Sequence, residues 1–317
     1  MNRDNTQHPY IMKLLLNTWH IGKIEKVEPI TSYWGKTSLV TASDGSGYIL
    51  KEKADFHKAE RECHLLVNLS QVGAPVAVPL LTRDSTWFAR QDDKLYCLYP
   101  RLSGEVFTDH YCGNALARAA GFGRALSSLH TYMLKVDPLV YIPELHLVEL
   151  INNWAFPCII EGIDPAESSA IKDAWRIIED EIEPVYDQLP KQIIHRDPNP
   201  ANFLFQDGQL TGFLDFDMAV WGPRIFDLCY CGTSILVSSY PDPTKMQQWT
   251  GLFQRLIDGY QETHSLTPAE KSSLFAVLVM IEFQFAAFSL ETGADGAARW
   301  NLNLVAWLME NRRHLSL

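Results

Sequence analysis

The pattern of apolar and polar positions changes about a third of the way along the chain. Residues before Ser103 form short alternating or apolar runs separated by turn signals, which is typical of strands. We expect strands over 24–31, 37–42, 48–51, 87–90 and 95–99, and short helices over 10–19 and 58–69. Asp44-Gly45 predicts a tight hairpin turn, because such turns require a positive φ.

After Ser103-Gly104, apolar residues recur every three or four positions, which indicates helices. The spacing predicts helices over 115–133, 164–189, 244–263, 267–290 and 295–314, with short strands between the second and the third. Asp164-Pro165 and Thr267-Pro268 resemble capped helix starts. The pattern therefore predicts an α+β fold with two lobes, a small β-rich one over 1–102 and a large helical one over 103–317.

One apolar stretch, residues 273–290, is about as long as a membrane span at best. Glu282 and Gln284 interrupt it, so we interpret it as a buried core helix and expect no membrane association. The N-terminus lacks the features of a secretory signal. The six cysteines show no CxxC spacing, so neither a zinc site nor disulfides are indicated. We expect a cytoplasmic protein with reduced thiols.

The charge balance bears on possible partners. Lys and Arg number 27 against 38 Asp and Glu, a formal net charge of −11. Nucleic acid is an unlikely partner for such a surface, because phosphate binding requires a dense cationic footprint. A small molecule that carries an amine is compatible with it. The sequence does not indicate the oligomeric state.

The segment from Ile193 to Asp217 carries the candidate chemistry. An apolar strand leads into His195-Arg196-Asp197, and Asn202 follows Asp197 by five positions. A predicted hairpin then leads to Asp215 and brings it back to the edge where Asn202 lies. Oxygen ligands of this kind suit a Mg²⁺ ion that also binds substrate phosphates. Asp197 can accept the proton of a substrate hydroxyl, so the spacing indicates kinase-type phosphoryl transfer.

The upstream lobe supplies candidate residues for binding a nucleotide. Lys51 ends the third predicted strand, where a cation can pair with the α- and β-phosphates of ATP. Glu62 or Glu60 on the next helix would hold this lysine, and the two cannot face the same way. We favour Glu62, because the following Leu65-Leu66 pair would pack its helix face on the sheet. Gly35 lies in a turn that occupies the place of a phosphate-covering loop.

The segment from Tyr99 to Leu102 is a candidate hinge for the adenine ring. Adenine requires a backbone C=O for its amino group and a backbone N–H for its ring nitrogen. Pro100 would offer its C=O and Leu102 its N–H. A proline is compatible with the first role, because it has no N–H to lose there.

Several segments together resemble the aminoglycoside phosphotransferase and choline kinase family, which has a protein kinase-like fold. They are SDGSGYILK, AERECHLL, CLYPRLSGEVF, GRALSSLH, IIHRDPNPANFLF and GFLDFDMAVWGPRIFDL, and the resemblance as a whole extends from about Thr18 to Leu236. Within the family, the chain is similar to type II homoserine kinases and bacterial stress-response kinases. The resemblance implies two lobes with ATP between them, and a helical lobe that sets the acceptor. It also implies that His195 orders the catalytic loop, and Arg196 replaces the family's usual glycine.

We therefore expect an ATP- and Mg²⁺-dependent kinase that phosphorylates a hydroxyl of an amino alcohol, a sugar or an aminoglycoside-like compound. A Ser/Thr protein kinase of the stress-response type is an alternative, but Phe226 follows Asp215 by only eleven positions, too few for an activation loop. A non-catalytic nucleotide-binding protein is a second alternative. The intact set of Lys51, Asp197, Asn202 and Asp215 argues against it. The choice between ATP and GTP stays open.

Other polar residues are open to more than one interpretation. Glu282 lies in an apolar helix, where a carboxylate is costly without a partner. We expect a cation beside it, either an amine of the acceptor or an internal arginine. Asp217 is a candidate for the metal or acceptor side, or a turn residue. We expect His130 and Asp227 to be structural, with Asp227 capping amides of the catalytic loop. Cys229 and Cys231 are expected to pack from a strand.

Overall fold

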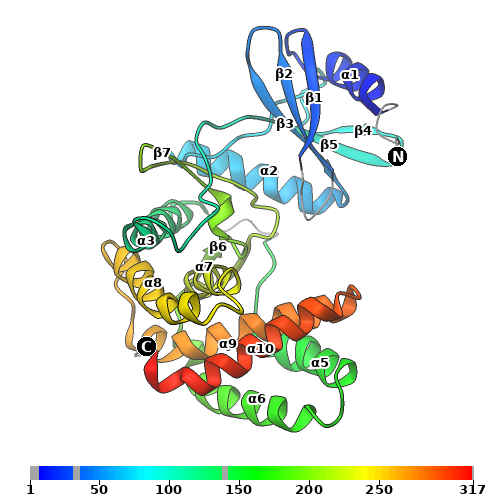
Figure 1. The fold of residues 1–317 in the computed structure, drawn as a ribbon. Coiled ribbons are helices and arrows are strands. Elements are labelled where there is room, and N and C mark those ends of the chain that lie inside the picture. Colours follow the sequence, from blue (N-terminus) through cyan, green and yellow to red (C-terminus); the bar gives the residue numbers. More distant parts are fainter. Residues whose placement is uncertain (1–6, 31–35, 138–141, 316–317) are drawn as a thin grey trace. The chain divides into compact units, whose positions relative to one another are not determined.

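The computed structural model describes residues 7–30, 36–137 and 142–315 (Figure 1). The chain divides into two compact units. Unit 1 consists of Met1–Glu105 and Leu204–Asp217, and unit 2 of Val106–Phe203 and Met218–Leu317. The predicted mixture of a β-rich and a helical part is confirmed. The predicted division at 102/103 is close to the first crossing, but it is wrong for 204–217, which returns to unit 1.

Unit 1 contains a five-stranded antiparallel sheet with the strand order β1-β2-β3-β5-β4. Its strands are β1 (Ile24–Ile30), β2 (Thr37–Ala42), β3 (Gly47–Lys53), β4 (Ala89–Gln91) and β5 (Lys94–Pro100). Each predicted strand is present within a few residues of its expected bounds. Side chains alternate between the two faces of a strand, so each face of the sheet receives its own set of residues.

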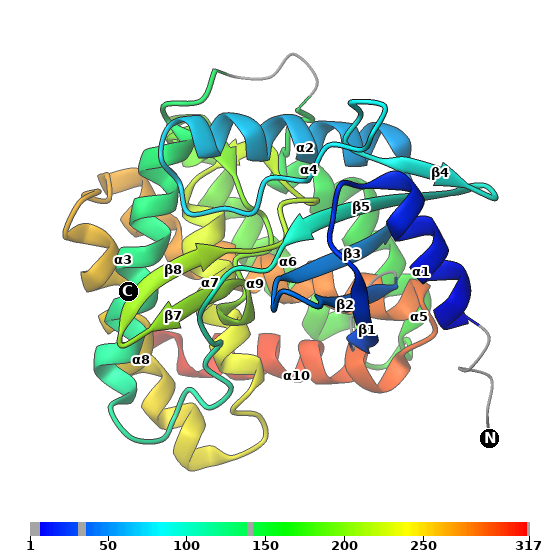
Figure 2. The ribbon, with the colours of Figure 1, turned by 90° about the horizontal axis from the view of Figure 1, so that it is seen from above.

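One face of this sheet packs on an apolar core. Val40, Leu50 and Leu98 form a core with Leu15 of helix α1 (Gln7–Thr18) and with Trp19, which directly follows this helix. Figure 2 shows α1 next to the strands. By the alternation of strand side chains, the lysines of β3 lie on the opposite face. That face receives helix α2 (Phe56–Gln71), whose first turn is capped by Asp55.

Backbone hydrogen bonds tie the segment 204–217 to unit 1. It contains most of the hairpin β7 (Phe203–Gln206) and β8 (Gln209–Phe213). Phe205 and Glu105 exchange two backbone hydrogen bonds of 2.9 Å, and the N–H of Phe213 donates to the C=O of Pro75 at 2.9 Å. At Gly104 φ is +119°, and an added Cβ would lie 2.3 Å from Oγ1 of Thr211. The hairpin thus approaches the chain at a point where only glycine fits.

Unit 2 is mainly helical. Its helices are α3 (Ala115–Met133), α4 (Leu147–Leu150), α5 (Phe156–Gly162), α6 (Ser168–Ile182), α7 (Ile225–Val237), α8 (Pro243–Gln261), α9 (Pro268–Glu291) and α10 (Asp295–Asn311). A π-helical turn (Ile151–Ala155) and short 3₁₀ turns (Glu183–Gln188, Pro200–Asn202, Arg312–His314) complete them. Strands β6 (Lys191–Ile194) and β9 (Val220–Pro223) pair in antiparallel fashion.

Helix α9 lies in the core of unit 2, and Figure 1 shows α10 alongside it. Among the described residues, α9 is the one helix long and apolar enough to cross a membrane, but 78% of its apolar window is buried inside the protein. Its start is the predicted one, since Thr267 and Glu270 form a reciprocal capping box. The interpretation of this stretch as a buried core helix is confirmed.

Helices α3 and α8 pack closely because two glycines meet at their crossing. An added Cβ at Gly123 would lie 2.0 Å from the C=O oxygen of Leu256, and one at Gly259 would lie 2.1 Å from that of Ala120. Any larger side chain would therefore force the two backbones apart. The predicted bounds of α3 are confirmed.

Three local predictions differ from the structure. Helix α6 begins at Ser168, because Asp164 instead accepts a hydrogen bond from the N–H of Ala166 in the preceding turn. The segment from α4 to α5 was not predicted to be helical. Cys229 and Cys231 lie in helix α7 and not in a strand, and both are buried.

Candidate active site

In unit 1, the nucleotide-side candidates Lys51 and Asp215 form an ion pair. Nζ of Lys51 lies 2.7 Å from Oδ1 of Asp215. Asp215 follows β8, and it has φ of +65°, a backbone conformation that side chains with a Cβ rarely adopt. The side chain of Lys51 is 23% exposed and that of Asp215 is 40% exposed. A phosphate or a metal ion can therefore reach both groups from solvent.

The structure corrects the predicted partner of Glu62. Glu62 pairs with Lys53, whose Nζ lies 2.5 Å from Oε2, and the two side chains are only 10% and 2% exposed. The alternative carboxylate, Glu60, lies instead 4.0 Å from the ring of His57. Lys51 and Lys53 are two positions apart on one strand and thus point to the same face. Only the packing of α2 decides which of them meets Glu62.

The buried pair is further held by a hydrogen bond and by its charge. The hydroxyl of Tyr99 donates to Oε2 of Glu62 at 3.3 Å. Burial disfavours the charge on Lys53, but the Glu62 carboxylate outweighs burial and raises the pKa of Lys53 above its ordinary value. Breaking a buried ion pair by removing one partner typically costs about 3–5 kcal/mol. This pair thus fixes α2 to the sheet.

The other candidates of unit 1 lie as follows. Oδ2 of Asp217 lies 3.9 Å from Nζ of Lys58. The N–H of Arg101 donates to the C=O of Gly47 at 2.9 Å, so Pro100 and Tyr48 form a pair without mutual hydrogen bonds. The C=O of Pro100 therefore points away from β3, and Leu102 follows just after β5. Gly35 lies outside the described residues. The adenine hinge stays a prediction.

In unit 2, the catalytic loop is held at its start by Asp227. The N–H groups of His195 and Arg196 donate to the two carboxylate oxygens of Asp227, each at 2.8 Å. The N–H of Asp197 donates to Nδ1 of His195 at 3.2 Å, and His195 is fully buried. The prediction that Asp227 caps amides of this loop is confirmed. The ring of His195 accordingly orders the loop.

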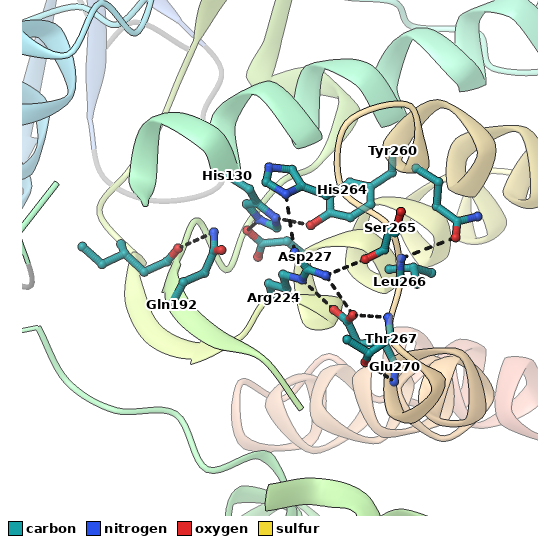
Figure 3. A network of polar contacts seen from close by, with 12 residues as sticks. His130, Gln192, Arg224, Asp227, Tyr260, His264, Ser265, Leu266, Thr267 and Glu270 are labelled. Carbon is teal, nitrogen blue, oxygen red and sulfur yellow. Dashed lines mark hydrogen bonds and ion pairs between the residues drawn. The ribbon is translucent and has the colours of Figure 1, made fainter. Parts of the chain in front are cut away.

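Asp227 is also part of a buried polar network (Figure 3). Nε2 of His130 lies 3.1 Å from Oδ2 of Asp227, and Nδ1 of His130 lies 2.7 Å from the hydroxyl of Tyr260. His130 is fully buried, so its interpretation as a core histidine is confirmed. Nearby, Arg224 makes two hydrogen bonds to Glu270, of 2.7 and 2.9 Å. The network thus connects α3, α7, α8 and α9.

Both oxygens of the Asp197 carboxylate accept hydrogen bonds from within unit 2. The side-chain amide of Asn202 donates to the backbone C=O of Asp197 at 2.8 Å and to its Oδ2 at 3.2 Å. On the other side, the hydroxyl of Tyr230 donates to Oδ1 at 2.6 Å. The spacing of Asp197 and Asn202 is thus realised as a direct contact.

Tyr230 is not among the residues that the sequence pattern singles out. It follows Asp227 by three positions, and on a helix such residues share a face. On the strand expected around Cys229, Tyr230 and Asp227 would point to opposite faces.

Among the described residues, Glu282 does not have the cationic partner that the sequence led us to expect. It is fully buried, and neither of its carboxylate oxygens has a hydrogen-bond partner in this part of the chain. Burial raises the pKa of Glu282 well above its ordinary value. The expectation of an internal arginine is therefore wrong. A carboxyl sealed in the helical core also does not present a charge to an acceptor.

The available donors fit a magnesium ion that takes most of its ligands from phosphate and water. Among the described residues, no group of three or more His, Cys, Asp and Glu side chains forms a metal cage. In unit 1, Asp215 offers a partly exposed carboxylate. In unit 2, Asn202 uses its amide nitrogen within the loop, so its side-chain oxygen is the atom with which it would bind a metal.

A family model and a curated relative both match most of the chain. A family model described as "Phosphotransferase enzyme family" matches residues 26–266. A homoserine kinase from Polaromonas naphthalenivorans (strain CJ2) is 23% identical over 260 residues, which cover 79% of each chain.

Solved structures resemble the whole chain. A microcompartment-associated aminopropanol kinase superposes with a TM-score of 0.76 at 17% identity, covering 98% of this chain and 99% of that one. An amicoumacin kinase in complex with AMP-PNP and Ca²⁺ superposes with a TM-score of 0.72 at 17% identity, covering 96% of this chain and 94% of that one. At such identities the likeness concerns the fold.

Proposed function

We propose that the chain, which belongs to the phosphotransferase enzyme family, is an ATP-dependent small-molecule kinase. In this proposal, Asp197 is the residue that accepts the proton of the acceptor hydroxyl. The observation that carries this proposal is the geometry of its carboxylate. Asn202 and Tyr230 fix both oxygens, and Asp227 holds the loop that precedes it. Such fixed placement is what a general base requires.

In the proposed reaction, the acceptor oxygen attacks the γ-phosphorus of ATP while its proton moves to Asp197. The bond between the γ-phosphorus and the β,γ-bridging oxygen breaks, and ADP leaves with that oxygen. Lys51 would pair with nucleotide phosphates in place of its present partner Asp215. A bound Mg²⁺ would neutralise phosphate charge, with Asp215 and Asn202 as the protein ligands that we propose.

We propose further that the acceptor is a small hydroxyl compound that carries an amine. The relatives support this class, since they are kinases of homoserine and of aminopropanol. The formal net charge of −11 would favour the approach of a cation. A cytoplasmic location is also proposed, and it is supported by six cysteines that are all unpaired.

The proposal is tested by measuring ADP release with ATP, Mg²⁺ and a panel of amino alcohols, hydroxy amino acids, sugars and aminoglycosides. We expect turnover with at least one acceptor, and Asp197→Asn should lower kcat by ~10²–10⁴-fold, the usual contribution of a positioned base. ATP affinity should be retained in this variant. Asp173→Asn, a change of an exposed carboxylate on α6, is the control. Turnover of Asp197→Asn within a few-fold of the wild type would contradict the assignment.

A further inference from the structure

Arg196 carries a partly buried positive charge. Its Nε is buried and has no hydrogen-bond partner among the residues that the structure describes. In the described part of the chain, no carboxylate forms an ion pair with its guanidinium, whereas Arg224 in the same unit is paired with Glu270. Burial lowers the pKa of Arg196, although an arginine keeps its proton in proteins. A desolvated charge of this kind is costly unless an anion compensates it.

The backbone at this position gives no reason for an arginine. Arg196 has φ of +66°, a region that a residue with a Cβ enters at a cost and that glycine enters freely. The interaction that holds the backbone here is the hydrogen bond from its N–H to Asp227, which any residue except proline could make. Non-glycine residues in such conformations cluster at functional sites. The side chain of Arg196 therefore calls for an explanation of its own.

The position of Arg196 supplies that explanation. Asp197 uses Oδ2 toward Asn202 and Oδ1 toward Tyr230. Arg196 directly precedes Asp197, and its backbone N–H is held by the same Asp227 carboxylate that holds His195. The guanidinium is therefore carried by the loop that presents the Asp197 carboxylate. An acceptor whose hydroxyl contacts Asp197 would have its neighbouring groups close to Arg196.

We propose that the acceptor carries a carboxylate in addition to its hydroxyl, and that Arg196 binds this carboxylate. The inference rests on the proposed kinase function and narrows its acceptor class to hydroxy acids, with hydroxy amino acids as the simplest compounds that also carry an amine. A guanidinium suits this role because its planar fork can donate two parallel hydrogen bonds to a carboxylate. The acceptor would supply the counterion that the free protein lacks.

The test uses pairs of acceptors that differ only in the carboxylate. Serine is compared with ethanolamine, homoserine with 3-aminopropanol, and threonine with 1-amino-2-propanol, by ADP release at saturating ATP. We expect the carboxylated member of at least one pair to have the higher kcat/KM. In Arg196→Gly, kcat/KM for that acceptor should fall roughly 30-fold or more, as when one partner of a buried charge pair is removed. Its decarboxylated counterpart should be little affected.

Glycine is the appropriate substitution because it suits the positive φ and should not disturb the loop. Arg196→Lys should recover only part of the loss, because lysine keeps the charge and lacks the fork. The KM for ATP should change less than twofold in either variant. The matched control is Arg124→Gln, which removes a half-exposed arginine paired with Glu262 on the surface of unit 2.

The inference is overturned if turnover is confined to acceptors without an anionic group. It is also overturned if Arg196→Gly lowers the activity on both members of a pair equally. Either result leaves the kinase function standing. Absence of both ATP binding and ADP release with every acceptor would refute the proposed function itself.

Discussion

The hydroxyl of Tyr230 donates a hydrogen bond of 2.6 Å to Oδ1 of Asp197. Burial, together with the neighbouring Asp197 charge, raises the pKa of Tyr230 above its ordinary value, so the phenol remains a donor. The tyrosine lies one helical turn after Asp227, which holds the start of the same loop. Helix α7 thus fixes both the loop and the orientation of its carboxylate.

We expect Tyr230→Phe to lower kcat by roughly 10- to 100-fold, because a hydrogen bond to a charged group is worth ~1.5–3 kcal/mol. The KM values for ATP and acceptor should stay within twofold. The acidic limb of the kcat profile should move to higher pH, since the lost bond stabilised the charged carboxylate. Tyr111→Phe, which removes a hydroxyl bonded to the C=O of Ile235, is the control. An unchanged kcat and pH profile would show that Tyr230 only packs.

The two lysines of β3 should differ in what their removal does. Lys51→Met should abolish measurable ATP binding at millimolar nucleotide and leave the melting temperature nearly unchanged, because an ion pair with a 40% exposed carboxylate contributes little to stability. Lys53→Met should instead destabilise unit 1 by about 3–5 kcal/mol, since it leaves the buried Glu62 unpaired. Nucleotide titration and thermal unfolding measure the two effects. Lys94→Met, at a half-exposed pair on the same sheet, is the control. If Lys53→Met abolished ATP binding and Lys51→Met lowered the stability instead, Lys53 would be the phosphate ligand.

Nucleotide binding should depend on magnesium. We expect the affinity of the wild type for ATP to fall at least tenfold in EDTA. The ATP affinity of Asp215→Ala should be lower by a similar factor with Mg²⁺ present. A metal ligand and the metal act as one unit, so EDTA should weaken ATP binding to this variant little further. Isothermal titration with and without metal measures this. Equal ATP affinity of the wild type in EDTA and in Mg²⁺ would argue against a metal–phosphate site.

Glu282 should make the protein less stable as the pH rises. Its folded-state pKa is raised by burial, so the folded state keeps a proton that the unfolded state releases above about pH 4.3. The stability difference is therefore largest in acid and is lost progressively as the pH rises toward the folded-state value. Glu282→Leu should raise the melting temperature at pH 8 more than at pH 4. Glu310→Gln, on the surface of α10, is the control. A melting temperature of Glu282→Leu below that of the wild type at pH 8 would contradict the expectation and reveal a partner for the charged carboxylate.

His264 should make the protein less stable as the pH falls, in contrast to Glu282. Burial and the neighbouring Arg224 lower its pKa, so the folded state binds fewer protons than the unfolded state below pH ~6.5. Stability should thus fall as the pH drops through this value and toward the folded-state pKa. His264→Gln should flatten this part of the profile, whereas His57→Gln, an 81% exposed histidine, should not. A parallel pH profile for His264→Gln and the wild type would contradict the expectation.

Local sequence patterns were sufficient to predict the main secondary-structure elements and the candidate catalytic motif. Alternation and three-to-four-residue spacing predicted the sheet and the long helices, because both follow from backbone geometry. The spacing from Asp197 to Asn202 predicted a phosphoryl-transfer loop, and the structure adds the direct contact between the two side chains. The structural role of Asp227 was likewise correct, although its hydrogen bond from His195 spans 32 positions.

Tertiary packing decided the remaining relationships. Lys51 and Lys53 point to one face of β3, and only the placement of α2 selects Lys53 as the partner of Glu62. A carboxylate in an apolar helix suggested a cation beside Glu282, but no described residue forms an ion pair or a hydrogen bond with it.

The hairpin 204–217 belongs to unit 1 because its backbone bonds reach Glu105 and Pro75, far away along the chain. Partners separated by so many residues leave no periodic trace in the sequence. These contacts form only when distant segments of the chain pack against one another, so they depend on the tertiary structure.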